Sequence, residues 1–188
     1  AYGSTDSRYE LNTHFNKIVS DKWATSFYLH GNTRIAKNDM NHDGFLDNPI
    51  GKQVNILNRW QYNDAEKGWV SFLNLRYMND EKQAGEVNFN PETDQFTSNA
   101  WGSEVNTEKI EISNKTGYVF PERPYQSFGF QNSFQSHRQD SYFGLNQYNM
   151  HQKSFYSNML FNSIITNTKN KFTTGINVAY DQYDEIVK

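Results

Sequence analysis

The chain contains no cysteine, which excludes disulfide bonds and thiolate metal sites. It has no apolar run near the roughly 20 residues that a membrane-spanning helix needs. Its net charge is −3, so nothing indicates nucleic-acid binding. It also lacks a nucleophile elbow, an H-E-x-x-H motif, a phosphate-binding loop and a dinucleotide fingerprint. We predict that it is not an enzyme. No signal peptide is visible at Ala1, Tyr2 and Gly3, so an exported protein would here be mature or partial.

Aromatic residues are abundant although the chain is polar overall. They make up 16% of the 188 residues, while hydrophobic residues reach only 36%. The mean hydropathy is −0.89. A disordered chain would be poor in aromatics. A barrel with a hydrated interior combines the two properties, because its lipid-facing band needs only alternate residues.

Eight stretches alternate apolar and polar residues, which is the side-chain period of a β-strand. The clearest of them places Ile110, Ile112 and Tyr118 on one face and Glu111 and Ser113 on the other. The alternation predicts strands at about 8–19, 23–32, 54–62, 69–77, 110–120, 128–135, 154–166 and 172–181. It predicts short turns at 20–22, 63–68, 121–124 and 167–170, and long polar connections at 33–51, 79–107 and 136–152.

Short turns at one rim and long loops at the other are typical of outer-membrane barrels. The predicted strands, of about 9–12 residues, match a tilted transmembrane strand. Many aromatics lie near strand ends, where interface girdles occur: Trp23, Trp60, Tyr62, Trp69, Tyr77, Tyr118 and Phe120. We therefore predict an all-β fold, an antiparallel up-and-down transmembrane β-barrel segment. A soluble meander or lipocalin-like barrel would show the same alternation and stays an alternative.

Several charged and imidazole side chains are predicted to share the polar face of the strands. Glu10, Arg59, Arg76 and Glu111 would form salt bridges and bind water in a barrel interior. His14 and His30 would lie on the polar faces of neighbouring strands. Ligation of a metal or haem iron by this pair is one alternative; histidines that only form hydrogen bonds inside a barrel are commoner.

The first long connection contains a motif typical of calcium loops. Residues 39–47 read D-x-N-x-D-G-x-x-D, which matches the first nine positions of an EF-hand loop. The predicted ligands are the side chains of Asp39, Asn41, Asp43 and Asp47 and the carbonyl of Phe45. The twelfth position is isoleucine, and no flanking helices are predicted, so the loop is not an EF-hand. An Asx-rich turn without a metal is the alternative.

The chain resembles the barrel of TonB-dependent outer-membrane receptors, most closely those of Bacteroidetes bacteria. The stretches that carry this resemblance are 9–12, 20–23, 29–31, 39–47, 52–53, 58–60, 68–78 and 117–118. The resemblance implies a 22-stranded barrel with an N-terminal plug, and energy supplied from the inner membrane by TonB. It implies import of a scarce nutrient such as cobalamin, a ferric siderophore or haem; the family also imports glycans.

This chain departs from the family in length. Eight predicted strands are far fewer than 22, and no plug, TonB box or terminal aromatic is present in a chain ending Glu185-Ile186-Val187-Lys188. We therefore predict that residues 1–188 are a partial β-barrel domain from a bacterial outer membrane. Expected partners are outer-membrane lipid, the TonB complex through parts outside this chain, a surface lipoprotein, and a small-molecule or metal-chelate ligand. A complete eight-stranded barrel and a soluble carbohydrate-binding module, with Trp and Tyr as stacking platforms, are the alternatives.

Overall fold

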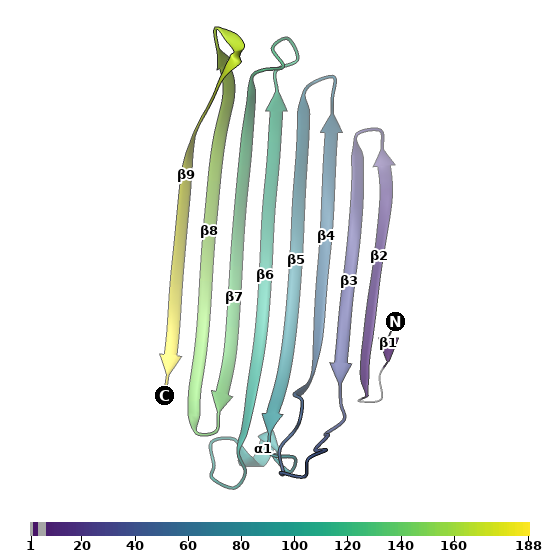
Figure 1. Ribbon diagram of the computed structural model, residues 1–188, viewed down its shortest axis with the longest axis vertical. Helices are drawn as coiled ribbons and strands as arrows, with labels where there is room; N and C mark the ends of the chain where they lie inside the picture. Colours follow the sequence, from purple (N-terminus) through teal and green to yellow (C-terminus); the bar gives the residue numbers. More distant parts are fainter. Residues whose placement is uncertain (1, 4–6) are drawn as a thin grey trace.

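The computed structural model describes residues 2–3 and 7–188 and folds them into one antiparallel sheet (Figure 1). The strands lie in the sheet in the order in which they occur in the chain. They are β1 (Tyr2–Gly3), β2 (Arg8–Ser20), β3 (Trp23–Arg34), β4 (Ile50–Asp64), β5 (Trp69–Gly85), β6 (Gly102–Val119), β7 (Ser127–Phe143), β8 (Asn146–Ile165) and β9 (Asn167–Val187). The predicted all-β, antiparallel, up-and-down fold is thereby confirmed.

The connections divide the sheet into two different ends. Short turns join β2 to β3, β4 to β5, β6 to β7 and β8 to β9 at one end, which we call the turn end (Figure 1). The connections 35–49 and 86–101 lie together at the opposite end, the loop end, with the short helix α1 (Pro91–Asp94) in the second of them. Within the described residues, β1 and β9 are the two edges of the sheet and no ladder joins them.

The eight strands β2 to β9 are longer than the sequence predicts, from 12 residues in β3 to 21 in β9. The predicted long connection 79–107 is wrong, because the observed one covers only 86–101. The predicted connection 136–152 is also wrong, because β7 continues to Phe143 and turns at Gly144-Leu145 directly into β8. Gly144 has a φ of 59° at the first of the two turn positions, where glycine is favoured in tight hairpins.

The predicted turn at 167–170 is misplaced as well. The chain turns at Thr166, which has a φ of 66°, and β9 begins at Asn167. The pairing then slips, since Ile165 pairs with Asn167 whereas Ile164 pairs with Lys171. The extra residues form an irregularity in β9 and not a turn.

Very little apolar surface is buried. The buried hydrophobic residues of the described chain are Phe89, Ala100 and Tyr142, all at the loop end. Among the same residues, no helix has the length and apolar character that crossing a membrane would require. The fold is therefore a single sheet whose two faces are mostly uncovered by the rest of the chain.

Candidate functional site

The ladder register separates the side chains of the sheet into two faces of different chemistry. Phe27, Leu75, Ile112 and Phe134 lie in one row of paired residues across β3, β5, β6 and β7. The side of the sheet that carries this row, together with every second residue along each strand, is called the apolar face. The polar face is the opposite side. Residues paired across strands point to the same face, and successive residues of one strand point to opposite faces.

The apolar face is largely exposed. Its uncovered large side chains include Tyr9, Leu11, Phe15, Phe27, Leu73, Leu75, Tyr77, Ile110, Ile112, Phe130, Phe134, Phe155, Ile176, Val178 and Tyr180. An exposed apolar surface that runs across a whole sheet is far larger than the patches found on soluble monomers. This face therefore requires a covering that the described residues do not supply.

Aromatic rings cross the apolar face near the turn end in two contact chains. Trp23 contacts Trp60 and Tyr62, with ring centroids 6.4 and 4.9 Å away. The second chain runs from Trp69 to Phe172, with neighbouring centroids 4.6–5.9 Å apart, through Tyr118, Phe120, Phe128 and Phe161. Such contacts stabilise neighbouring strands beyond simple burial. Together the two contact chains place amphipathic tryptophan and tyrosine rings along the turn-end rim of the sheet.

The polar face carries the charged side chains that the alternation assigned to it. Arg76 lies opposite Glu111 in the register, and its Nε donates to Asn55 Oδ1 at 3.1 Å. The guanidinium of Arg59 lies 4.4 Å from the ring centroid of Phe72, a cation–π contact. A shallow recess of about 400 Å³ is lined by Arg76 with Asn12, Thr13, His14, Tyr28, Leu29, His30, Asn55 and Leu57.

The two histidines of this recess lie close together, and both are engaged by neighbouring side chains. His30 donates from Nδ1 to Asn12 Oδ1 at 2.6 Å, and its Nε2 accepts from Asn32 Nδ2 at 3.1 Å. The ring of His14 stacks on Tyr28 with a centroid distance of 6.2 Å. Both ring nitrogens of His30 are hydrogen-bonded, so neither presents a free lone pair to a metal ion.

The carboxylates of the acidic loop bind its own backbone. Asp39 accepts hydrogen bonds from the amides of Asp43 and Gly44, at 3.1 and 2.9 Å. Asp43 accepts from the amide of Phe45 at 2.8 Å, and Asp47 from that of Met40 at 2.8 Å. Asn41 donates from Nδ2 to Asp43 Oδ2 at 2.9 Å. No group of three or more His, Asp or Glu side chains suited to a metal occurs in the described part of the chain. Calcium binding at Asp39, Asn41, Asp43, Phe45 and Asp47 stays a prediction.

The acidic loop is attached to the second loop at the loop end. Phe45 forms a β-bridge with Glu86, and the amide of Val87 donates to the carbonyl of Gly44 at 2.9 Å. Lys37 Nζ donates to the carbonyl of Val87, also at 2.9 Å. These bonds hold residues 35–49 and 86–101 together as one unit.

The second loop covers a small aromatic cluster. Phe89 and Phe96 lie 6.4 and 5.3 Å from Tyr142, measured between ring centroids. Phe89 also occupies the space above Gly102, where a Cβ would collide with its ring. The hydroxyl of Tyr142 is buried with no hydrogen-bond partner, and burial together with the nearby Glu104 carboxylate raises the pKa of Tyr142. This is where the protein buries aromatic rings with its own chain.

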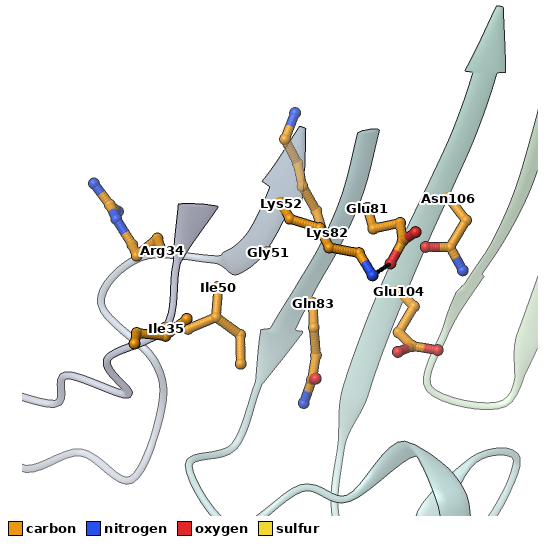
Figure 2. Close-up of a pocket in the computed structure, with 10 residues that line it drawn as sticks. All are labelled: Arg34, Ile35, Ile50, Gly51, Lys52, Glu81, Lys82, Gln83, Glu104 and Asn106. Atoms are coloured by element: carbon orange, nitrogen blue, oxygen red, sulfur yellow. Dashed lines mark ion pairs between the residues drawn. The ribbon is translucent and has the colours of Figure 1, made fainter. Parts of the chain in front are cut away.

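A pocket of about 350 Å³ lies beside this cluster, between the start of β4 and the loop-end halves of β5 and β6 (Figure 2). Its lining includes Ile50, Gln83 and Glu104, which form one row on the side of the apolar face. Two residues further toward the turn end, on the same face, Lys52 pairs with Glu81. Lys52 Nζ lies 3.0 Å from Glu81 Oε2, the ion pair drawn in Figure 2. The sequence did not indicate this pocket, because both faces are polar here and the alternation carries no signal.

The turn end has its own polar clamp. Asp64 is 2% exposed and accepts hydrogen bonds from Lys22 Nζ at 2.6 Å, from the Tyr62 hydroxyl at 3.1 Å and from the Lys67 amide at 3.2 Å. The Lys22 ammonium is the main cause that lowers the pKa of Asp64, and the Asp64 carboxylate in turn raises the pKa of Lys22. The clamp joins the β2–β3 turn to the end of β4.

Comparison of the chain with protein-family models, with curated proteins and with solved structures gave no match. The class that the fold defines is an all-β protein with one antiparallel up-and-down sheet. Any finer assignment depends on the chemistry of the two faces.

Proposed function

We propose that this chain is part of the β-barrel of a TonB-dependent active transporter in a bacterial outer membrane. In this proposal the apolar face contacts lipid and the polar face lines a hydrated interior. The observation that carries it is the division of one sheet into an exposed face of aromatic and aliphatic side chains and an opposite face that bears Arg59, Arg76 and Glu111. A transmembrane barrel needs this alternation of lipid-facing and interior side chains.

The small buried core argues against a soluble carbohydrate-binding module. A soluble domain of about 150 residues buries roughly 68–70% of the surface that its unfolded chain exposes. Here the buried hydrophobic residues are Phe89, Ala100 and Tyr142, while three of the four tryptophans, Trp23, Trp69 and Trp101, stay at least 42% exposed. In a lipid bilayer these exposed aromatic and aliphatic side chains would contact hydrocarbon and not water, so the apolar face would need no further protein to cover it.

The open edges favour a piece of a larger barrel over a complete eight-stranded one. A closed barrel has no unpaired edge. In the described residues, β9 and the β1–β2 side of the sheet are not paired with each other. Along β9 the side chains are exposed over nearly the whole strand, which leaves it free to pair with a further strand.

Import of a scarce nutrient is the activity we propose, on the strength of the family resemblance. The candidate cargoes are cobalamin, a ferric siderophore or haem. The attached loops 35–49 and 86–101 would help to capture the cargo outside the cell, and the recess on the polar face lies on its path through the interior. TonB would act through parts of the transporter outside this chain, and a surface lipoprotein is an expected partner.

Two experiments test the proposal at different levels. The polypeptide that contains this chain is refolded into phospholipid vesicles, because a sheet with open edges does not span a bilayer alone. We expect protease-protected β-structure in the segment 1–188 and heat-modifiable migration on a gel. A chain that remains a folded monomer in buffer without detergent would contradict the membrane assignment. In cells that express the polypeptide containing this chain, uptake of labelled cobalamin, ferric siderophore and haem is compared with and without TonB. Uptake that does not depend on TonB would contradict the transporter class.

A further inference from the structure

Charged side chains are excluded from one continuous zone of the apolar face. We bound the zone in each strand by an aromatic or aliphatic residue of this face. It covers Tyr9–Phe15 in β2, Trp23–Leu29 in β3, Val54–Tyr62 in β4, Trp69–Tyr77 in β5, Ile110–Tyr118 in β6, Phe128–Phe134 in β7, Phe155–Phe161 in β8 and Phe172–Tyr180 in β9. The residues of this face within the zone are apolar, aromatic, or uncharged Ser, Thr and Asn. Lys17, Lys52, Asp64 and Glu108 lie on the same face just outside it.

We call this uncharged region the lipid zone. It does not run parallel to the rows of residues that the ladders pair. One row connects Phe15 of β2 with Tyr180 of β9 through Phe27, Asn58, Leu75, Ile112, Phe134 and Phe155. Phe15 is the turn-end limit of the zone in β2, whereas Tyr180 is its loop-end limit in β9. The zone therefore moves toward the turn end, by about its own height, between β2 and β9.

The slope of the zone can be converted into an angle. Between β2 and β9 the loop-end limit moves by six residues and the turn-end limit by eight, which at ~3.3 Å per residue is about 20 and 26 Å. The seven spacings between β2 and β9 add up to roughly 34 Å at ~4.8 Å each. The zone is thus inclined to the pairing rows by about 30–38°, close to the 35–45° strand tilt of membrane barrels. A shift of about one residue per strand is also the ratio that gives eight-stranded barrels a tilt of ~36°.

The height of the zone fits a membrane. Each stretch covers seven or nine residues, for example Trp69–Tyr77. With the inclination included, its backbone spans about 16–22 Å, to which the terminal side chains add several ångströms, against a band of ~25 Å in outer-membrane barrels.

We propose that the hydrocarbon layer of a lipid bilayer contacts this sheet along the oblique lipid zone, an inference that rests on the proposed function. The strands are then tilted by the angle of the zone, and their charged extensions stand in water at the loop end. The extension is eight or nine residues long in β5–β8 but only one residue long in β2. The pocket of Figure 2 lies on the outer wall above the bilayer and outside the cargo path.

Single-cysteine variants test the inclination, and residues 1–188 contain no native cysteine that would compete for the label. Leu11 and Asp184 lie in the same row, yet only Leu11 is inside the lipid zone. Leu11→Cys, Asp184→Cys and, as the polar-face control, Asn12→Cys are spin-labelled in the polypeptide that contains this chain, reconstituted in phosphatidylcholine vesicles. We expect the label at 11 to be several-fold more accessible to oxygen than to a water-soluble nickel complex, and the labels at 12 and 184 to show the reverse.

The outcomes separate the two proposals. Equal lipid accessibility at 11 and 184 overturns the inclination and leaves the membrane assignment standing. Water accessibility at 11 as well as at 184 overturns the membrane assignment and the inclination with it. Leu29→Cys and Lys153→Cys form a second pair in one row, which repeats the test if a variant of the first pair does not fold.

Discussion

Two parts of the same strand treat their aromatic side chains in opposite ways. In the lipid zone of β7, Phe130 and Phe134 are each 43% exposed, whereas Tyr142 at the loop end of the same strand is 4% exposed. All three lie on the apolar face, since they differ by even numbers of residues along β7. The chain covers Tyr142 with Phe89 and Phe96 but leaves the other two bare. The protein supplies its own cover only where we expect water on the outside.

The strongest test of this contrast places a charge in the lipid zone. We expect Leu73→Arg to lower the free energy of unfolding in vesicles by about 2–4 kcal/mol, as for basic residues near the bilayer midplane. The matched control is Asn74→Arg, the next residue along β5, whose side chain lies on the polar face. Urea titration of vesicle-bound protein measures both. Equal losses in the two variants would mean that the faces do not differ in environment.

The second test removes the cover at the loop end. Phe89→Ala should destabilise the 86–101 loop by about 2 kcal/mol, because the ring is 2% exposed and leaves a cavity beside Tyr142. Hydrogen exchange of the loop amides is the measurement. Ile35→Ala, in the neighbouring loop and 65% exposed, is the control and should change little. Unchanged exchange in Phe89→Ala would show that the cluster does not hold the loop.

The third test concerns a covered polar group at the turn end. The lowered pKa of Asp64 means that the Lys22–Asp64 clamp stabilises the fold above the ordinary carboxyl value of 3.8, and that this stability is lost as the pH falls below it. The raised pKa of Lys22 means that the contribution is complete below 10.5 and is lost as the pH rises through the folded value. Unfolding midpoints measured from acid to alkaline pH, below 3.8 to above 10.5, report how stability depends on the clamp. Asp64→Asn should flatten the acid limb, and an unchanged limb would exclude the clamp as its cause.

The smallest expected effect is calcium binding at the acidic loop. A bound ion there would stabilise the loops that cover Tyr142 at the loop end. If calcium binds residues 39–47, it should lower protease cleavage there, with the modest affinity of extracellular sites. Asp43→Ala should abolish the difference between calcium and chelator. Identical cleavage of the original chain with and without calcium would favour the Asx-rich turn, in which Asp43 accepts hydrogen bonds from Asn41 and from the Phe45 amide.

The sequence predicted the fold well in the lipid zone and poorly beyond it. From Trp69 to Tyr77 one face is mostly apolar, so the period of two is visible and the start of β5 was placed correctly. From Asn79 to Gln83 both faces are polar, because both would meet water, and the strand was mistaken for a loop. The same cause hid the pocket at Gln83 and Glu104. The acidic loop was recognised because its spacing of carboxylates is a local signal, while its attachment to Glu86 depends on pairing between distant segments.

The strand order has a consequence for how such a sheet can form. Each long strand pairs only with its neighbours in the sequence, and the paired segments are joined by connections of at most 16 residues, the longest being 86–101. Contacts of this kind close short loops, so a hairpin can form before the next one has left the unfolded state. Growth can then proceed strand by strand from either edge, and removing hairpins from one end leaves the remaining ladders intact, much as in a repeat array. A sheet built in this way can be lengthened without redesign, since β9 offers the next strand the same kind of edge that β8 offers to β9.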